Sequence, residues 1–263
     1  MPAHERWSKG SAYEPYVGRW SRLAAKGFID WLAPTPGGRW IDVGCGTGAL
    51  TETILGTAQP TSVRGVDPSQ DFVGFASGRI ADPRAEFAVA DAHHLPDHGD
   101  PYDYTVSGLV LNFVSDPAGA LAAMKKVTRA GGCIAAYVWD YSDGMEMMRY
   151  FWDAAAELDP HAASLDEGVR FPICRPERLR SLWEQATLHE VAVVPIDIET
   201  EFRDFDDYWS PFLGGQGPAP TYNLSLAGSA REELKTLLRR RLPVGDDGSI
   251  PLRARAWGVR GQT

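Results

Sequence analysis

The chain has 263 residues, of which 44% are hydrophobic and 23% are charged. These proportions are those of a globular protein, so they exclude a disordered, collagen-like or coiled-coil chain, and the length allows one large α/β domain or two small ones. The 35 acidic residues outnumber the 26 basic ones and give a formal net charge of −9, which would repel a phosphate backbone. Nucleic acid is therefore not an expected partner.

Cysteine usage and hydropathy indicate a cytoplasmic protein. Cys45, Cys133 and Cys174 lie far apart and form no C-x-x-C pair, so neither a zinc site nor a disulfide framework is expected. Residues 1–10 contain no apolar core segment, and no later stretch approaches about 18 uninterrupted apolar residues. We therefore expect neither export nor membrane spanning.

The first half of the chain alternates short β-branched runs with helical patterns. Apolar residues spaced by three and four predict a helix over 16–32, which ends at Pro34 and the glycines that follow. The later elements are predicted in this order: strand 39–43, helix 49–55, strand 61–67, helix 69–78, strand 86–90, strand 102–107, helix 117–129 and strand 132–139. This alternation requires parallel strands joined by crossover helices, which predicts an α/β, Rossmann-like, doubly wound sheet.

The alternation breaks after Asp140. Residues 141–174 are rich in Met, Tyr, Phe and Trp without strand character, and Pro195 places a strand over 188–199 at a sheet edge. Further elements are a helix over 176–185, a helix near 231–241 and a last strand over 250–259. We divide the single predicted domain, 1–263, into an N-terminal closing helix (1–38), a cofactor-binding core (39–140), two lid insertions (141–174 and 200–249) and the C-terminal part of the sheet (175–199 and 250–263).

A glycine turn between the first strand and the second helix is the most informative segment. It reads Asp42-Val43-Gly44-Cys45-Gly46-Thr47-Gly48-Ala49. Glycines let a backbone approach a ligand closely and adopt positive φ, but this run also satisfies the dinucleotide pattern G-x-G-x-x-A. Asp42 would repel a pyrophosphate, whereas it would attract a ligand that carries an ammonium and a sulfonium. The acid therefore favours a cationic ligand.

Two further acids follow neighbouring strands. Asp67 ends the second strand, where a carboxylate can accept both ribose hydroxyl protons. Asp91 follows the third strand, at a position suited to an adenine amino group. Any one of these acids alone is more simply a surface cap or turn residue, but the ordered set predicts a nucleoside site.

These segments resemble the class I S-adenosylmethionine-dependent methyltransferases, and in particular their small-molecule, type 11-like branch. The resemblance rests on five segments in the family's order: 41–48, 66–67, 91–92, 102–107 and 126–132. It implies a seven-stranded, mostly parallel sheet with an antiparallel last strand, and S-adenosyl-L-methionine as cofactor with S-adenosyl-L-homocysteine as product. The cofactor-binding residues it implies are Tyr16, Arg19, Asp42, Gly44, Cys45, Gly46, Asp67, Asp91, Ala92, Ser107 and Leu109.

The N-terminal segment 13–20 resembles the helix that closes over the cofactor in the small-molecule branch. The resemblance implies that Arg19 meets the methionine carboxylate. The alternative is an arginine exposed to solvent on an amphipathic helix, and the sequence leaves both open.

Both insertions are expected to leave from the carboxyl edge of the sheet and to form a lid over the transferred methyl group. Their aromatic residues either line an apolar acceptor pocket or pack the lid core: Tyr141, Tyr150, Phe151, Trp152, Phe205, Tyr208, Trp209 and Phe212. Methyl transfer needs in-line alignment above all, so a general base is optional. The candidate bases are Asp140, Tyr141 and His94.

No metal is assigned, because adjacent His93 and His94 point apart and have no evident third ligand. Residues 107–113 lack the Asn/Asp-Pro-Pro-Tyr/Phe motif of the DNA-methylating branch, which again disfavours nucleic acid. The expected partner is a small-molecule methyl acceptor, and the sequence does not set the oligomeric state.

Two alternatives to a methyltransferase remain. A nicotinamide-dependent oxidoreductase is disfavoured by Asp42 and by the lack of an evident Tyr-x-x-x-Lys pair. A non-catalytic protein that binds S-adenosylmethionine stays open, because the glycine turn and the acids serve binding rather than chemistry.

Overall fold

A computed structural model describes residues 18–96, 99–214 and 217–263. Tyr16 and the start of the predicted helix over 16–32 lie outside the described residues. The described part of that helix is α2 (Arg19–Leu32).

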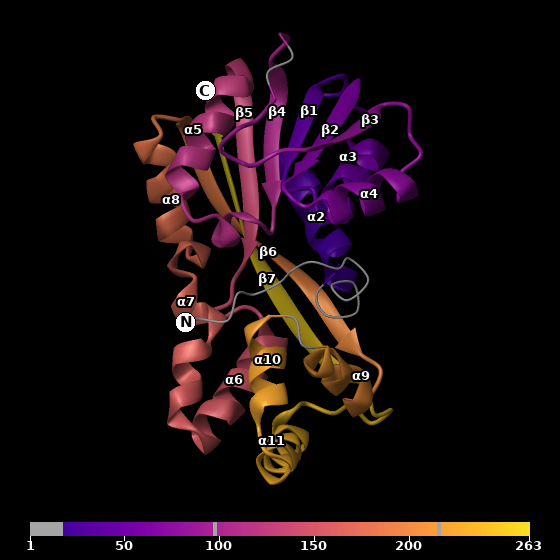
Figure 1. Cartoon of the computed structure of the whole chain (residues 1–263), viewed down its shortest axis with the longest axis vertical. Helices are drawn as coiled ribbons and strands as arrows, with labels where there is room; N and C mark the ends of the chain where they lie inside the picture. Colours follow the sequence, from indigo (N-terminus) through magenta and orange to yellow (C-terminus); the bar gives the residue numbers. More distant parts are fainter. Residues whose placement is uncertain (1–17, 97–98, 215–216) are drawn as a thin grey trace.

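Seven strands form one mixed sheet in the order β3-β2-β1-β4-β5-β7-β6 (Figure 1). They are β1 (Arg39–Val43), β2 (Ser62–Asp67), β3 (Ala85–Val89), β4 (Tyr102–Gly108), β5 (Thr128–Trp139), β6 (His189–Phe202) and β7 (Ile250–Gln262). β7 pairs antiparallel with both β5 and β6, whereas the other described strand pairs are parallel. The predicted Rossmann-like sheet with an antiparallel last strand is therefore confirmed, and β6, which contains Pro195, is an edge strand as expected.

Helices cover both faces of this sheet. On β7, a Cβ at Gly258 would lie 3.3 Å from the Trp31 ring of α2, whereas a Cβ at Gly261 would lie 3.0 Å from the Trp183 ring. Because residues 258 and 261 point to opposite faces of a strand, α2 and the helix that holds Trp183 lie on opposite sides. The helices next to the sheet are α2, α3 (Ala49–Thr57), α4 (Gln70–Arg79), α5 (Pro117–Val127) and α8 (Pro176–Gln185).

Helix α5 ends two residues earlier than predicted, and β5 begins four residues earlier. The reason is Thr128, whose hydroxyl donates to the Met124 carbonyl at 2.7 Å and lies 2.6 Å from the Thr105 hydroxyl of β4. Thr128 is also in register with Tyr102. The Thr128 side chain thus hydrogen-bonds both to the last turn of α5 and to β4. Because of these two hydrogen bonds, α5 ends and β5 begins at this β-branched residue.

The two insertions form a helical region beyond the carboxyl ends of β1 and β4, in the lower part of Figure 1. Its elements are α6 (Glu146–Leu158), η3 (Pro160–Leu165), α7 (Glu167–Arg170), η4 (Pro172–Cys174), α9 (Phe205–Trp209), η5 (Ser210–Leu213), α10 (Pro218–Ser225) and α11 (Gly228–Arg241). Phe151 stacks on Phe212 with ring centroids 4.5 Å apart, and both side chains are fully buried. These two aromatic residues belong to the same hydrophobic core cluster as the sheet residues, which favours core packing over an acceptor pocket for them.

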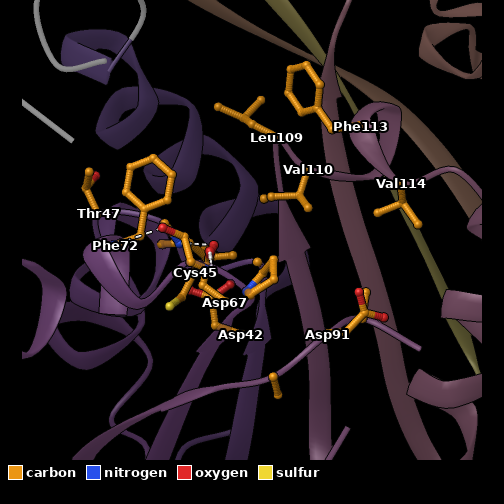
Figure 2. A pocket seen from close by; sticks show the side chains of 18 of the residues that line it. Asp42, Cys45, Thr47, Asp67, Phe72, Asp91, Leu109, Val110, Phe113 and Val114 are labelled. Carbon is orange, nitrogen blue, oxygen red and sulfur yellow. Dashed lines mark hydrogen bonds between the residues drawn. The ribbon is translucent and has the colours of Figure 1, made fainter. Parts of the chain in front are cut away.

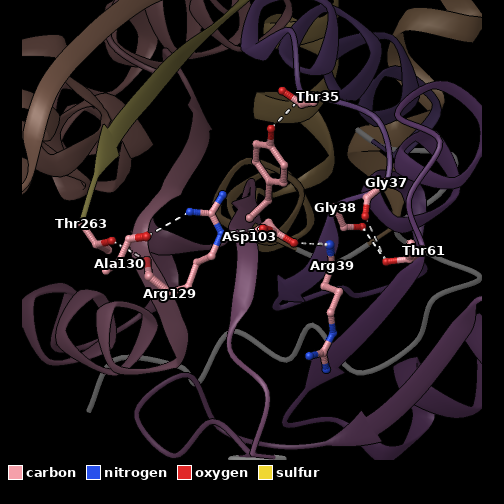
Figure 3. Close-up of polar contacts among 10 residues, drawn as sticks. Thr35, Gly37, Gly38, Arg39, Thr61, Asp103, Arg129, Ala130 and Thr263 are labelled. Atoms are coloured by element: carbon pink, nitrogen blue, oxygen red, sulfur yellow. Dashed lines mark hydrogen bonds and ion pairs between the residues drawn. The ribbon is translucent and has the colours of Figure 1, made fainter.

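The amino edge of the sheet is tied together by Asp103 of β4 (Figure 3). Its Oδ2 accepts the Arg39 backbone N–H at 2.8 Å, and its Oδ1 accepts the Arg129 Nε–H at 2.6 Å. Burial raises the pKa of Asp103, but these two donors outweigh it and hold the pKa below its ordinary value. This carboxylate joins β1, β4 and β5 at the edge away from the glycine turn.

Candidate functional site

A cavity of about 380 Å³ opens at the carboxyl ends of β1, β2 and β4. The predicted cofactor-binding residues that line it are Asp42, Gly44, Cys45, Gly46, Asp67, Asp91, Ala92 and Leu109. Figure 2 shows Asp42 and Asp67 at one end, with Leu109 and Phe113 at the other. The cavity therefore has an acidic end and an apolar end.

The glycine turn is pinned to the end of β2. The backbone N–H groups of Gly44 and Cys45 both donate to the Val66 carbonyl, at 2.7 and 2.9 Å. Gly44 has a φ of +76°, and a Cβ there would lie 2.5 Å from Val110 Cγ1. Only glycine fits both the backbone conformation and the space. The turn thus brings bare backbone against the cavity.

Asp67 is held by two backbone donors. Its Oδ2 accepts the Gly46 N–H at 3.0 Å, and its Oδ1 accepts the Ser69 N–H at 2.9 Å. Burial raises the pKa of this carboxyl, although the two N–H groups oppose the rise. Each oxygen retains a lone pair, so the fixed carboxylate can also accept hydrogen bonds from ligand hydroxyls.

Asp42 is the least satisfied acid of the cavity. Its side chain is 1% exposed, and its Oδ2 accepts the Thr51 hydroxyl at 2.7 Å. Its Oδ1 is buried and has no hydrogen-bond partner in the described part of the chain. Burial, with a smaller contribution from the charge of Asp67, raises the pKa of Asp42 to about 7 despite the Thr51 hydrogen bond. A cationic ligand group would relieve both the missing partner and the cost of ionisation.

Asp91 is positioned by His93, a cavity residue that sequence reasoning considered only as a metal ligand. Asp91 Oδ1 accepts the His93 backbone N–H at 2.8 Å and lies 2.7 Å from His93 Nδ1. His93 Nε2 lies 3.0 Å from the Asp116 carbonyl oxygen. Because both ring nitrogens face acceptors, Asp91 and then Asp116 raise the pKa of His93, and His93 lowers the pKa of Asp91. Both of these contacts use Oδ1 of Asp91 and not Oδ2.

Ser107 does not line the cavity, contrary to expectation. Its side chain is 1% exposed, and its hydroxyl donates to the Val43 carbonyl at 2.8 Å, which joins β4 to β1. Gly108 and Leu109 line the cavity instead. Leu109 has a φ of +61°, which turns the chain after β4, and this turn is not visible in the sequence.

Arg19 is likewise not among the described residues that line the cavity, although Ser21 of the same helix is. Arg19 Nη1 bonds to Asp207 Oδ1 of α9 at 3.0 Å. Its guanidinium carbon lies 4.5 Å from the ring centroids of both Trp20 and Phe202. The Arg19 side chain is thus held between two rings and an acid and is 29% exposed.

The three candidate bases lie outside the cavity lining. Asp140 is 4% exposed and accepts the Asp143 backbone N–H at 3.2 Å, and Tyr141 packs on Phe171 with centroids 5.8 Å apart. The side chain of His94 is 88% exposed.

Sequence reasoning missed Tyr137 of β5, which lines the cavity and whose hydroxyl would lie 2.7 Å from a Cβ on Gly108.

No group of three or more His, Cys, Asp or Glu side chains within the described ranges is placed to hold a metal ion. Across those same ranges, no helix is both long enough and apolar enough to cross a bilayer.

The strand order, the glycine turn and the acids at the strand ends define a Rossmann-like nucleoside-binding fold of the kind found in methyltransferases. Residues 41–132 match the family described as "Methyltransferase domain". This segment of the chain is therefore a methyltransferase domain, and the resemblance to the class I family is confirmed.

Curated relatives match over part of their length. The chain is 31% identical over 138 residues to a ubiquinone biosynthesis O-methyltransferase of Burkholderia vietnamiensis, which covers 50% of this chain and 56% of that protein. It is 33% identical over 103 residues to a demethylmenaquinone methyltransferase of Roseiflexus castenholzii, with 39% and 43% covered. The chain thus spans about half the length of these relatives.

Solved structures share the fold over most of the chain. A phosphoethanolamine N-methyltransferase 2 of Haemonchus contortus, in complex with S-adenosyl-L-methionine, aligns with a TM-score of 0.60 at 14% identity, covering 97% of this chain and 57% of that one. The YcgJ protein of Bacillus subtilis aligns with a TM-score of 0.57 at 15% identity, covering 92% and 99%. At these identities the likeness concerns the fold.

Proposed function

We propose that this protein is an S-adenosylmethionine-dependent methyltransferase that methylates a small organic acceptor. The observation that carries this proposal is the buried Asp42 carboxyl, which lies at the glycine turn with one oxygen unpartnered within the described residues. A nucleoside ligand with a cationic amino acid part fits that oxygen, whereas a pyrophosphate would add a negative charge to it. The unpartnered Asp42 oxygen therefore also argues against a nicotinamide cofactor.

The cavity residues fit the parts of the cofactor. Asp42 would face the cationic methionine part beside the bare backbone of Gly44 and Gly46. Asp67, fixed by two N–H groups, would accept the ribose hydroxyls. Asp91 would accept the adenine amino group through Oδ2, because His93 occupies Oδ1.

When bound, S-adenosylmethionine would supply an electrophilic methyl group, which bonds to the acceptor nucleophile as its bond to sulfur breaks and S-adenosylhomocysteine leaves on the opposite side. The chain's part is to hold the two reactants in line and to exclude water. Leu109, Val110, Phe113 and Val114 supply an apolar wall for that purpose. The Tyr137 hydroxyl is the polar group of β5 at this wall.

A small acceptor is supported by the net charge of −9 and by the apolar wall. It is also supported by relatives named for ubiquinone biosynthesis and for demethylmenaquinone. The helical region of α6 and α9 to α11 would act as the lid over the acceptor. Free thiols at Cys45, Cys133 and Cys174 support a cytoplasmic location.

The test is calorimetric titration of the protein with S-adenosylmethionine, S-adenosylhomocysteine and NADH. We expect micromolar binding of the first two, about −8 kcal/mol, and none of NADH. The substitution Asp67→Ala should abolish the binding of S-adenosylmethionine and S-adenosylhomocysteine. The control is Asp71→Ala, because Asp71 is an exposed acid on α4, and this variant should bind both as the unchanged protein does. Binding of NADH alone would overturn the proposal. Binding without any turnover of methyl donor across a panel of small acceptors would favour the non-catalytic alternative.

A further inference from the structure

The phenol ring of Tyr137 lies across the end of β4. Tyr137 of β5 is in register with Gly108 of β4. A Cβ on Gly108 would lie 2.7 Å from the Tyr137 hydroxyl oxygen and 2.8 Å from Cζ and Cε1 of the ring. Gly108 does not have a positive φ, so this glycine provides space rather than an unusual backbone conformation. Because β4 lies between β5 and β1, the ring leans from β5 over β4 and toward β1.

Phe28 of α2 holds the Tyr137 ring in this position. The two rings pack with their centroids 4.7 Å apart, and both side chains are buried. Tyr137 nevertheless lines the cofactor cavity, together with Gly108. The hydroxyl and the ring edge beside it are the atoms that lie over Gly108, so this end of the side chain reaches the cavity. The cavity wall therefore contains a phenol hydroxyl whose ring is fixed by packing.

Asp42 lies on the other side of β4 and points to the same face of the sheet. It is in register with Val106 of β4, two residues before Gly108. Because alternate residues of a strand point to one face, Asp42 and Tyr137 share a face. Their contacts agree with this, since Asp42 bonds to Thr51 of α3, Tyr137 packs on α2, and these two helices are in contact. A carboxyl group and a phenol hydroxyl thus flank the end of β4 within one cavity.

Among the described residues, no lysine or arginine lines this cavity. The imidazole of His93, which does line it, faces Asp91 and the Asp116 carbonyl oxygen. The methionine part of S-adenosylmethionine carries a carboxylate as well as an ammonium. Asp42 and Asp67 would repel that carboxylate, so it needs hydrogen-bond donors, and here these are uncharged. A phenol O–H is a donor of this kind.

We propose that the Tyr137 hydroxyl donates to the carboxylate of the cofactor's methionine part, while Asp42 accepts from its ammonium. The inference rests on the proposed function and adds a specificity-determining residue to it. An α-amino acid carries both charged groups on one carbon atom, so their partners must lie near each other, as Asp42 and Tyr137 do at the end of β4. The pair selects nucleosides that carry a complete amino acid over nucleosides that have lost the carboxylate.

The experiment is a calorimetric titration at pH 8 with S-adenosylhomocysteine, its decarboxylated analogue, which keeps the ammonium, and its deaminated analogue, which keeps the carboxylate. Tyr137→Phe removes only the hydroxyl. Its affinity for S-adenosylhomocysteine and for the deaminated analogue should fall about tenfold, whereas its affinity for the decarboxylated analogue should not change. Asp42→Asn should instead lose affinity for the two ligands that keep the ammonium. The control is Tyr104→Phe, because the Tyr104 hydroxyl accepts the Thr35 backbone N–H at 2.9 Å, outside the cavity lining, and this variant should bind all three ligands unchanged.

Two results with Tyr137→Phe would overturn the contact: an equal loss of affinity for S-adenosylhomocysteine and the decarboxylated analogue, or no loss for either. If this variant does not fold, Phe28→Leu replaces it, because it keeps the hydroxyl but removes the ring that holds it. The preference for S-adenosylhomocysteine over the decarboxylated analogue should then fall about threefold, and an unchanged preference would overturn the contact. Failure of S-adenosylhomocysteine to bind the unaltered protein would reject the proposed function together with the contact, whereas the two results named first reject the contact alone.

Discussion

The two edges of the sheet use the same residue type in opposite ways. At the amino edge both oxygens of Asp103 have donors, from the Arg39 backbone and the Arg129 side chain, and its pKa is held below its ordinary value although burial opposes this. At the carboxyl edge Asp42 has one donor for two oxygens, and burial raises its pKa to about 7. An aspartate with a donor for each oxygen joins strands, whereas an aspartate with one oxygen left without a donor can accept a ligand there.

The largest expected effect comes from the glycine turn of the carboxyl edge. Gly44→Ala forces a side chain into positive φ and against Val110, which should cost about 3 kcal/mol and weaken S-adenosylhomocysteine binding about a hundredfold. At Gly46 a Cβ would meet nothing within 4 Å, so only the strain of its φ of +52° remains, about 1 kcal/mol. Calorimetry on both variants measures the difference; equal losses would show that space at Gly44 is unimportant.

The next largest effect is expected from one aspartate substitution at each edge of the sheet, which should change stability at one edge and cofactor affinity at the other. Asp103→Asn replaces an acceptor with a donor between two donors, so the free energy of unfolding should fall by about 1–2 kcal/mol with cofactor affinity unchanged. Asp42→Asn should do the reverse at pH 8: unchanged or higher stability, with affinity reduced about tenfold or more. Urea unfolding and calorimetry on both variants measure this. Loss of affinity in Asp103→Asn would remove the distinction between the edges.

A pH dependence follows from Asp42. Its pKa rises from 3.8 to about 7 on folding, so its contribution to stability is complete below pH 3.8 and is lost as the pH rises through 7. A cationic ligand favours the ionised carboxyl, so affinity should fall about tenfold per pH unit below 7. Calorimetry with S-adenosylhomocysteine from pH 5.5 to 8 measures this, and Asp42→Asn should flatten the profile. An unchanged profile in the variant would assign the titration to another group.

The smallest effect concerns His93. His93→Gln keeps one donor toward Asp91 or Asp116 but not both, so affinity should fall about threefold. Because the pKa of His93 is raised, its contribution to stability is complete below the ordinary pKa and is lost as the pH rises through the raised value. 15N spectra of the imidazole should show both ring nitrogens protonated above the usual titration range. A neutral ring at pH 6.5 would refute the positioning of Asp91 by an imidazolium.

The sequence predicted the sheet because its signals are local. Period-two runs, helix caps such as Ser69 and the glycine turn each depend on a few neighbouring residues, and Ser69 does accept the Phe72 N–H, at 3.4 Å. It also predicted that Asp42, Asp67 and Asp91 meet, because parallel strands bring their carboxyl ends to one edge.

What the sequence did not predict depends on tertiary contacts. Ser107 turns toward Val43, and Arg19 turns toward Asp207, which is 188 residues away along the chain. Helices α6, α9 and α10 were missed as well. In α6 the buried positions, such as Met148, Phe151, Trp152 and Ala155, follow helical spacing, so the sequence itself carries a signal for this helix.

The place of β7 in the sheet has a consequence for how the chain folds. It is the last of the described strands to be synthesised, yet it lies between β5 and β6 and pairs with both along most of their length. Until its residues emerge, β5 and β6 each present an unpaired edge that can associate with other chains. A chain that stops before Ile250 would therefore lack the strand that closes the sheet, and we expect it to aggregate rather than to accumulate as a folded fragment.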